Sequence, residues 1–300
     1  RHHRVVDYMN HVANETPHFK LHEYGRTSED RPLLALVMSS VSNMEGLDQI
    51  IADNTRRVSE GIDGGARIPI VYLSYNVHGN EAVCTEAAMR TIEALVNEHS
   101  DLLNDVVVIV DPCVNPDGRD RYVQFQDRTS GPVPNTSWES WEHKEPWPGG
   151  RSNHYMFDLN RDLAWQTQIE TQARTTFYRK WMPHVHVDYH EQGMNSPYYF
   201  APAAEPLHQV ITPWQRKCQE HIGGFNARAF DARGALYFTR EIFDLFYPSY
   251  GDTWPMFHGA IGMTYEQGGS GSAGRAILTE IGDTLTLAYR IENHHATAIA

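Results

Sequence analysis

Two residues with metal-binding side chains directly follow a segment that has the composition of a buried strand. The segment spans residues 68–75, and His78 and Glu81 come three residues apart just after it. On a tight loop or a first helical turn, this spacing presents an imidazole nitrogen and a carboxylate to the same ion. The chain holds 17 histidines, so such a pair also arises by chance. Taken alone, the pair favours an ordinary surface contact at a helix start.

A second segment places four polar side chains on one face of a strand. Alternate residues of a strand share a face, so His184, His186, Asp188 and His190 lie together. Burying them is costly unless they are paired or bind a metal. We expect His184 and His186 to form hydrogen bonds in the interior, whereas His190, at the strand end, is the better ligand candidate.

A carboxylate ends a third strand-like segment. Glu266 follows apolar residues and precedes a glycine-rich loop, which predicts a carboxyl group at the rim of a cleft. Partial burial there raises the pKa of a carboxyl group and makes the group a better general base. An exposed glutamate at a strand end fits this segment equally well.

Asn160 and Arg161 are adjacent and supply amide and guanidinium donors. A guanidinium matches the two oxygens of a carboxylate, so this pair is a candidate site for a substrate carboxylate. The alternative is an internal salt bridge from Arg161 to Asp158 or Asp162.

The elements that must position these side chains alternate between strand and helix. The sequence predicts strands at 19–24, 33–38, 68–75, 106–110, 184–190 and 261–266 and helices at 1–14, 43–60, 82–98, 166–182, 214–230 and 284–297. We interpret 115–119 as an ordinary turn and 127–150 as a long irregular loop. This order predicts one α/β domain whose sheet is covered by helices on both faces, with its ligand site at the carboxyl ends of the strands.

Composition excludes several classes of protein. There are 25 basic and 38 acidic residues, and a net charge of −13 disfavours binding to nucleic acid or to an anionic membrane surface. The longest aliphatic run, 106–110, is far too short to span a membrane. Three cysteines without a C-x-x-C pair exclude a disulfide scaffold and a thiolate zinc cluster.

Taken together and in this order, the motifs resemble those of the zinc metallocarboxypeptidase family, which includes carboxypeptidases A and B. The matching elements are His78/Glu81, Asn115-Pro-Asp-Gly118, Asn160-Arg161, His190 and Glu266. The resemblance implies an α/β fold with a mixed, roughly eight-stranded sheet between helices. It also implies that residues 1–300 are one catalytic domain, which we expect to be a fragment of a longer protein.

The resemblance further implies a zinc-dependent hydrolase that removes C-terminal amino acids from peptides. His78, Glu81 and His190 would bind one Zn²⁺ ion and leave a position open for water. Glu266 would be the general base. By likeness to long, secreted bacterial members, we expect an extracytoplasmic location.

The family also uses side chains that bind the substrate. Asn160 and Arg161 would bind the terminal carboxylate of a peptide with a free C-terminus, and Tyr250 is favoured over Tyr247 as the residue that closes over it. An oxyanion-stabilising arginine is expected between the N-P-D-G and N-R motifs, and we favour Arg151. The other arginines in that interval are Arg119, Arg121 and Arg128. The oligomeric state and the preferred terminal residue stay open.

Three alternatives remain. H-G-N-E around Asn80 and the D-L-N-R sequence resemble the aspartoacylase and succinylglutamate desuccinylase branch, which cleaves N-acyl amino acids with the same zinc site. The H-x-H-x-D pattern from His184 approaches that of metallo-β-lactamase-like hydrolases, but that fold leaves the His78/Glu81 pair without a role. A non-catalytic binder is the third alternative, and the presence of every ligand and of the base gives it no support.

Overall fold

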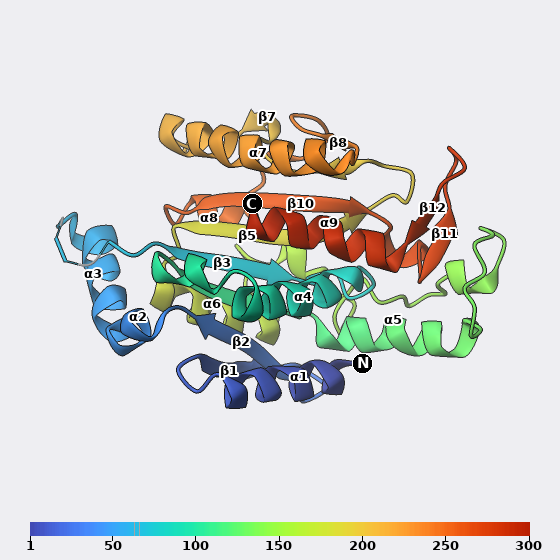
Figure 1. Ribbon diagram of the computed structural model, residues 1–300, viewed down its shortest axis with the longest axis horizontal. Coiled ribbons are helices and arrows are strands. Elements are labelled where there is room, and N and C mark those ends of the chain that lie inside the picture. The colour runs from blue at the N-terminus through green and yellow to red at the C-terminus, as the bar shows by residue number, and fades with distance from the viewer. Residues whose placement is uncertain (63, 66) are drawn as a thin grey trace.

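The computed structural model describes residues 1–62, 64–65 and 67–300. Within these residues one mixed sheet has eight strands in the order β1-β2-β4-β3-β5-β10-β6-β8 (Figure 1). Its strands are β1 Lys20–Arg26, β2 Pro32–Met38, β3 Ile70–Tyr75, β4 Val107–Asp111, β5 Val185–Gln192, β6 Tyr198–Tyr199, β8 Tyr237–Phe238 and β10 Ile261–Gly268. Two short pairs lie outside it, β7 Ala204–Leu207 with β9 Asp244–Leu245 and β11 Ala276–Leu278 with β12 Thr284–Thr286. The predicted α/β fold with a mixed sheet of about eight strands is confirmed.

Nine α-helices are found among the described residues. They are α1 His2–Glu15, α2 Val41–Glu45, α3 Leu47–Glu60, α4 Val83–Asn97, α5 Pro116–Thr129, α6 Ile169–Trp181, α7 Pro213–Arg233, α8 Thr253–Met256 and α9 Leu287–Ile299. In Figure 1, α4 and α9 lie in front of the sheet and α6 lies behind it.

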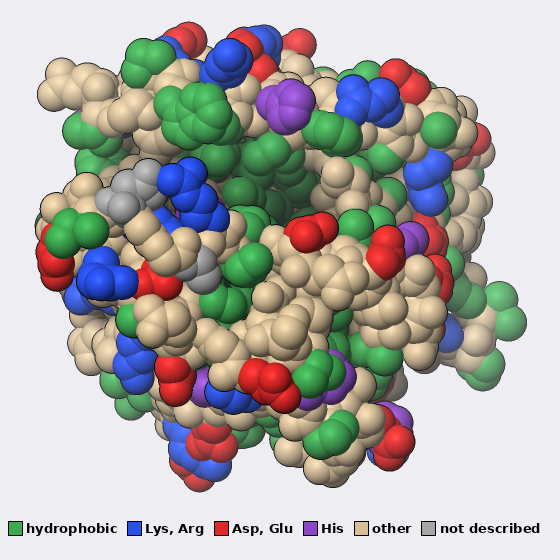
Figure 2. All heavy atoms as spheres, turned by 60° about the vertical axis from the view of Figure 1, so that its left-hand side comes forward, with side chains coloured by type: hydrophobic (Ala, Val, Ile, Leu, Met, Phe, Trp, Pro, Cys, Tyr) green, Lys and Arg blue, Asp and Glu red, His purple; other side chains and the backbone are tan. Residues whose placement is uncertain are grey.

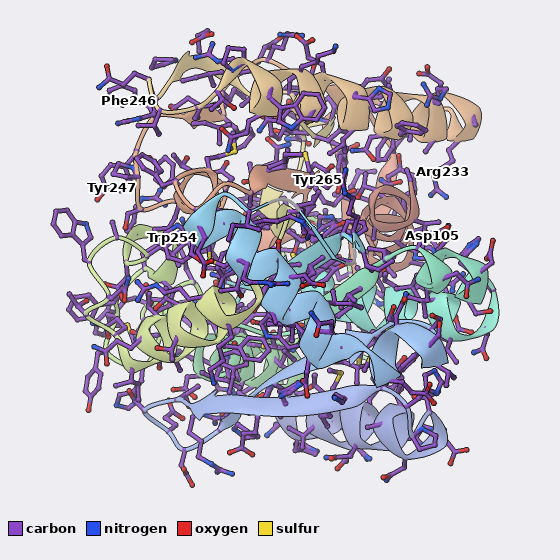
Figure 3. The ribbon with its side chains drawn as sticks, turned by 90° about the vertical axis from the view of Figure 1, so that its left-hand side faces the viewer. Asp105, Arg233, Phe246, Tyr247, Trp254 and Tyr265 are labelled. Atoms are coloured by element: carbon purple, nitrogen blue, oxygen red, sulfur yellow. The ribbon has the colours of Figure 1, made fainter. Side chains whose placement is uncertain are left out.

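The sheet separates two hydrophobic cores because successive strand residues point to opposite faces. In β2, Leu34 and Leu36 join the core under α1, α4 and α9, whereas Ala35 and Val37 join the core under α3 and α6. Trp254 of α8 closes this second core, its ring 5.1 Å from that of Tyr178 in α6 (Figure 3). Both faces are therefore buried, which explains the continuous apolar runs of the central strands.

The central strands β4, β3, β5 and β10 run parallel to one another. Their carboxyl ends meet at the edge of the sheet that faces right in Figure 1, towards α5. This common edge is where the sequence predicts the functional side chains.

Some boundaries differ from the prediction. Residues 115–119 are not an ordinary turn but the start of α5: the Asn115 side chain accepts a hydrogen bond from the Gly118 amide, and Pro116 occupies the first helical turn. An asparagine cap followed by proline is a helix start signal. The irregular segment consequently begins after Thr129, not at Asp127. Gly46 separates α2 from α3 within the predicted helix 43–60, and 284–286 is a strand.

The face on the side of α3 lies opposite the carboxyl ends of the parallel strands. Acidic and basic side chains are interspersed over it rather than gathered by sign (Figure 2). Within the described residues, no helix combines the length and apolar character that crossing a bilayer requires.

Candidate metal centre

The first two candidate ligands lie on a tight turn that follows β3. Asn76 adopts a left-handed backbone conformation with φ of 62°, which turns the chain directly after Tyr75. Its side-chain amide donates to the carbonyl oxygens of His78, at 2.6 Å, and Glu81, at 3.2 Å. The buried asparagine thus fixes the backbone between the two ligands, so that their side chains leave the turn on the same side.

This turn is packed backbone to backbone against its neighbours. A Cβ atom on Gly79 would overlap the backbone of Gly118 and Arg119 and lie 2.5 Å from the carbonyl oxygen of Gly150. Three glycines therefore lie in contact and leave no room for a side chain: Gly79 of H-G-N-E, Gly118 of N-P-D-G and Gly150 of the loop before Arg151. The positions of the three motifs depend on one another.

The third candidate ligand comes from β5, the neighbouring parallel strand. His190 pairs in register with Glu266 of β10, which brings both residues to the same level of the sheet edge. Beside them, Tyr189 of β5 pairs with Tyr75 of β3, directly before the turn that carries His78. Residues more than 70 positions apart therefore meet at the ends of three adjacent strands.

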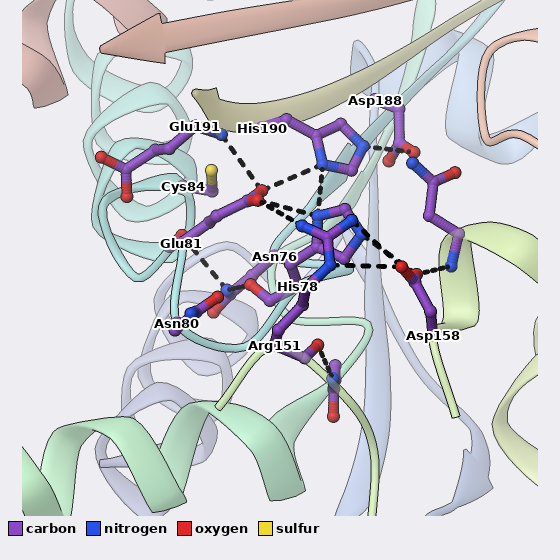
Figure 4. A network of polar contacts seen from close by, with 12 residues as sticks. Asn76, His78, Asn80, Glu81, Cys84, Arg151, Asp158, Asp188, His190 and Glu191 are labelled. Carbon is purple, nitrogen blue, oxygen red and sulfur yellow. Dashed lines mark hydrogen bonds and ion pairs between the residues drawn. The ribbon is translucent and has the colours of Figure 1, made fainter. Parts of the chain in front are cut away.

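The three candidate ligands form a compact, buried cluster (Figure 4). Nδ1 of His78 lies 2.8 Å from Oε1 of Glu81, Nδ1 of His190 lies 3.0 Å from Oε2 of Glu81, and the two Nδ1 atoms are 3.2 Å apart. One ligand atom from each residue falls within 4.8 Å of the others. Burial raises the pKa of the Glu81 carboxyl, but the two imidazoles outweigh this and keep that pKa well below its usual range.

A carboxylate contacts the far nitrogen of each imidazole, partly buried for Asp158 and fully buried for Asp188. Oδ1 of Asp158 lies 3.1 Å from Nε2 of His78, and Oδ2 of Asp188 lies 2.9 Å from Nε2 of His190. A carboxylate that accepts the Nε2 proton leaves the Nδ1 lone pair free for a metal. Two imidazole nitrogens and one carboxylate fit a Zn²⁺ ion with an open coordination position, because a further carboxylate orients each imidazole by a hydrogen bond.

These ligands line one side of a cavity of about 290 Å³. The cavity is also lined by the remaining predicted site residues, Arg151, Asn160, Arg161, Tyr250 and Glu266. Burial raises the pKa of Glu266 to about 8. Burial likewise raises the pKa of Asp252, a further lining residue, to about 7.

Asn160 and Arg161, the predicted carboxylate-binding pair, lie on a short turn that is hydrogen-bonded to a neighbouring loop. The Asn160 side-chain oxygen accepts from the amide of Gly251 at 2.6 Å, and the Ser249 hydroxyl donates to the carbonyl of Arg161 at 2.8 Å. Within the described residues Arg161 makes no ion pair with Asp158 or Asp162; Asp162 instead accepts from the backbone of 167–168. The salt-bridge alternative is therefore wrong, and the guanidinium stays available to an anion.

Arg151 contacts the cluster itself. Its Nη1 atom lies 3.5 Å from Oε1 of Glu81, and its guanidinium also binds Asp158 at 3.0 Å. The structure thus places this arginine within reach of the candidate ligands, although the long preceding loop obscures its spacing in the sequence.

Two other histidines, His184 directly before β5 and His186 within it, lie away from the centre. Nδ1 of His184 accepts from the amide of Ile70 at 3.0 Å, as expected for an interior histidine. His186 is buried between the rings of Tyr72 and Tyr178, and within the described residues neither of its ring nitrogens has a hydrogen-bond partner, so the expected interior hydrogen bond is wrong for this histidine. The H-x-H-x-D pattern therefore does not gather its side chains around a metal.

Sequence reasoning missed some residues of the site. It considered Asp158 only as a salt-bridge partner, although its place two residues before Asn160 was the available signal. Asp252 and Thr264 also line the cavity, and no motif distinguishes them. Gly251 was missed because its contribution is the absence of a side chain next to Asp188.

An α/β sheet with a histidine–glutamate–histidine cluster at its edge defines a class of metal-dependent hydrolases. The family model described as zinc carboxypeptidase matches residues 5–225. The chain therefore belongs to the zinc carboxypeptidase family. Among curated proteins, no sequence matches the chain.

Solved structures of metallo-carboxypeptidases share the fold. The enzyme from Burkholderia cenocepacia aligns with a TM-score of 0.68 at 15% identity, over 98% of this chain and 66% of its own. Carboxypeptidase A from Helicoverpa armigera gives 0.65 at 16% identity, over 98% and 69%. The Pseudomonas aeruginosa metallo-carboxypeptidase, in complex with (2-guanidinoethylmercapto)succinic acid, gives 0.64 at 13% identity, over 99% and 66%. The chain thus spans about two thirds of the length of these relatives.

Proposed function

We propose that the protein is a zinc-dependent carboxypeptidase that removes amino acids from the free C-terminus of peptides. The observation that carries this proposal is the shared cavity: the three candidate ligands, a buried carboxyl group and a guanidinium that forms no ion pair with any described residue line the same space of about 290 Å³. A metal-dependent hydrolase needs metal ligands and a general base, and selection for a terminal carboxylate needs the guanidinium.

His78, Glu81 and His190 would hold one Zn²⁺ ion. When bound, the ion would lower the pKa of a water molecule and polarise the scissile carbonyl. Glu266 would take the proton from that water and pass it to the leaving amine. A raised pKa suits this task because a carboxyl group that ionises near neutral pH both accepts and returns a proton.

The remaining residues would orient the peptide. Arg161 would bind the terminal carboxylate through two parallel hydrogen bonds, with the amide nitrogen of Asn160 as a further donor. Arg151, 3.5 Å from Glu81, would stabilise negative charge on the carbonyl oxygen. Tyr250 would cover the bound residue, since its ring already lies over Arg161.

The proposal is tested by mass spectrometry of a peptide mixture incubated with the zinc-loaded protein. Each peptide is supplied with a free and with an amidated C-terminus, and a chelator-treated sample is the control. Stepwise loss of C-terminal residues from the free forms alone, abolished by the chelator, is expected. Intact peptides together with cleaved N-acyl amino acids would instead establish the amidohydrolase alternative, and inertness towards both would favour a binder.

We also propose an extracytoplasmic location. The support is the likeness to long, secreted bacterial members of the family. Fractionation of the native host, with an antibody against this domain, tests the proposal: recovery with cytoplasmic markers would contradict it.

A further inference from the structure

A carboxylate that the reaction does not use lies directly beneath the metal centre. Asp188 is fully buried on β5, two residues before the candidate ligand His190. Its Oδ2 atom lies 2.9 Å from Nε2 of His190 (Figure 4). The side chain lies on the face of the sheet that α6 covers and is not among the residues that line the cavity, so it has no access to a peptide substrate.

A buried guanidinium accompanies this carboxylate. Nη2 of Arg174, on α6, lies 3.7 Å from Oδ1 of Asp188 and donates to the hydroxyl of Ser74 at 2.6 Å. Ser74 is itself the register partner of Asp188 in the parallel β3–β5 pair. An unpaired buried carboxylate is costly, and a nearby opposite charge reduces that cost. Arg174 therefore allows Asp188 to be ionised beneath the sheet.

Asp188 approaches His190 only because the adjoining loop has no side chain at residue 251. A Cβ atom on Gly251 would overlap Oδ2 of Asp188 and lie 3.3 Å from Oδ1 of Asn160. The Gly251 amide also donates to that same Asn160 oxygen at 2.6 Å. One glycine thus separates the carboxylate behind the metal ligand from a residue that lines the cavity.

We infer that Asp188 is a positioning residue for His190, held by Arg174 on one side and by Gly251 on the other. Asp188 accepts the Nε2 proton of His190, so the Nδ1 lone pair faces Glu81 and His78. It also restrains rotation of the ring about the Cβ–Cγ bond. This inference rests on the metal centre of the proposed function, but it concerns metal affinity and needs no substrate.

The test measures zinc affinity of the purified chain by competition with a chromophoric chelator. Asp188→Asn keeps the size of the side chain but removes its charge, and its amide can turn towards Nε2 as a donor. We expect about 10- to 100-fold weaker zinc binding. We also expect a changed visible absorption spectrum of the Co²⁺-loaded protein, which a loss of stability alone would not produce.

Asp111→Asn is the matched control. Asp111 is equally buried in the same polar cluster and accepts hydrogen bonds from Tyr24 and Tyr72, at 2.8 and 2.9 Å, but it does not contact His190. Its variant is expected to keep the wild-type zinc affinity and Co²⁺ spectrum. Equal losses in both variants, or wild-type affinity in Asp188→Asn, would overturn the inference.

If Asp188→Asn does not fold, a second pair of variants tests the same inference. Gly251→Ala changes no charge but displaces Oδ2 of Asp188, and it is expected to weaken zinc binding. In Gly193→Ala the new Cβ atom would meet only the Ser196 hydroxyl oxygen, at 3.7 Å, and affinity should not change. Equal affinities of the two alanine variants would overturn the inference but leave the proposed function intact. Absence of zinc binding by the wild-type protein would overturn both.

Discussion

The guanidinium carbon of Arg161 lies 4.5 Å from the centroid of the Tyr250 ring. A cation over an aromatic face is attracted by the ring, so each residue helps to hold the other in place. Hydrogen bonds from Ser249 to Arg161 and from Gly251 to Asn160 join the same two segments. The proposed carboxylate-binding turn and the loop with the covering tyrosine therefore form one structural unit.

Removal of the Arg161 charge should specifically weaken binding of peptides with a free C-terminus. A hydrogen bond to a charged group contributes about 2 kcal/mol, so Arg161→Gln should lower kcat/KM about 30-fold, mainly through a higher KM. Steady-state kinetics on one peptide measure this change. Arg128→Gln, at an exposed arginine whose Nε donates to the carbonyl of Gln124 in its own helix, is the control. Equal kinetics of the two variants would contradict the assigned role.

Glu266 should act in the chemical step and not in metal binding. Glu266→Gln removes the proton acceptor and keeps the shape of the side chain, so kcat should fall by about 100- to 10,000-fold. The zinc content of the variant, measured by mass spectrometry of the metal, should stay at the wild-type level. Loss of zinc together with activity would instead make Glu266 a ligand.

The pH profile should show ionisation of the same carboxyl group. Burial raises the pKa of Glu266 to about 8 in the zinc-free chain, and the charge of a bound Zn²⁺ ion lowers it from there. Because a base works only when ionised, kcat/KM should rise with pH through this pKa and then level off. Stopped assays between about pH 5 and pH 9 measure the profile. A profile that falls over this whole range would contradict the role of Glu266 as a base.

Much of the site could be predicted because its chemistry depends on residue types at strand ends. His78, His190 and Glu266 each lie at or just after the end of a predicted strand. The carboxyl ends of parallel strands meet at one edge of a sheet. Local patterns did not reveal Asp158 as the partner of His78, because a contact across 80 positions depends on how the loops pack. The same holds for Gly251, which no periodicity distinguishes from a turn glycine.

Glycine contacts between the motif loops should contribute to stability. A Cβ atom on Gly118 would overlap the carbonyl oxygen of Gly150 and lie 2.7 Å from that of Ser152. Gly118→Ala should therefore lower the free energy of unfolding by about 1–3 kcal/mol, despite its place in α5. Gly224, in α7, is the control: its new Cβ atom would have only a side-chain nitrogen of Arg228 nearby, at 3.8 Å.

Gly224→Ala should raise the free energy of unfolding by up to about 1 kcal/mol, since alanine favours a helix over glycine. Urea unfolding followed by circular dichroism compares the two variants. A stabilised Gly118→Ala variant would mean that the loops tolerate a wider separation than the structure has.

Acid should destabilise the fold through His186. Burial lowers the pKa of this histidine to about 3, and within the described residues neither ring nitrogen has a hydrogen-bond partner. The ring instead lies between Tyr72 and Tyr178, with centroid distances of 5.3 and 5.6 Å. Its folded-state pKa is below the value of about 6.5 in an unfolded chain, so the unfolded state binds the proton first as pH falls.

Protonation of this histidine in the unfolded state should therefore lower the free energy of unfolding by about 2 kcal/mol between pH 7 and pH 5. The unfolded pKa lies about 1.5 pH units above pH 5, and each unit contributes about 1.4 kcal/mol. His186→Phe keeps an aromatic ring between the tyrosines and removes the titrating group. Urea unfolding at the two pH values should give a correspondingly smaller loss for this variant than for wild type. His11→Gln, at an exposed position of α1, should leave the wild-type loss unchanged. An equal loss in wild type and His186→Phe would mean that His186 is accessible to protons in the folded state.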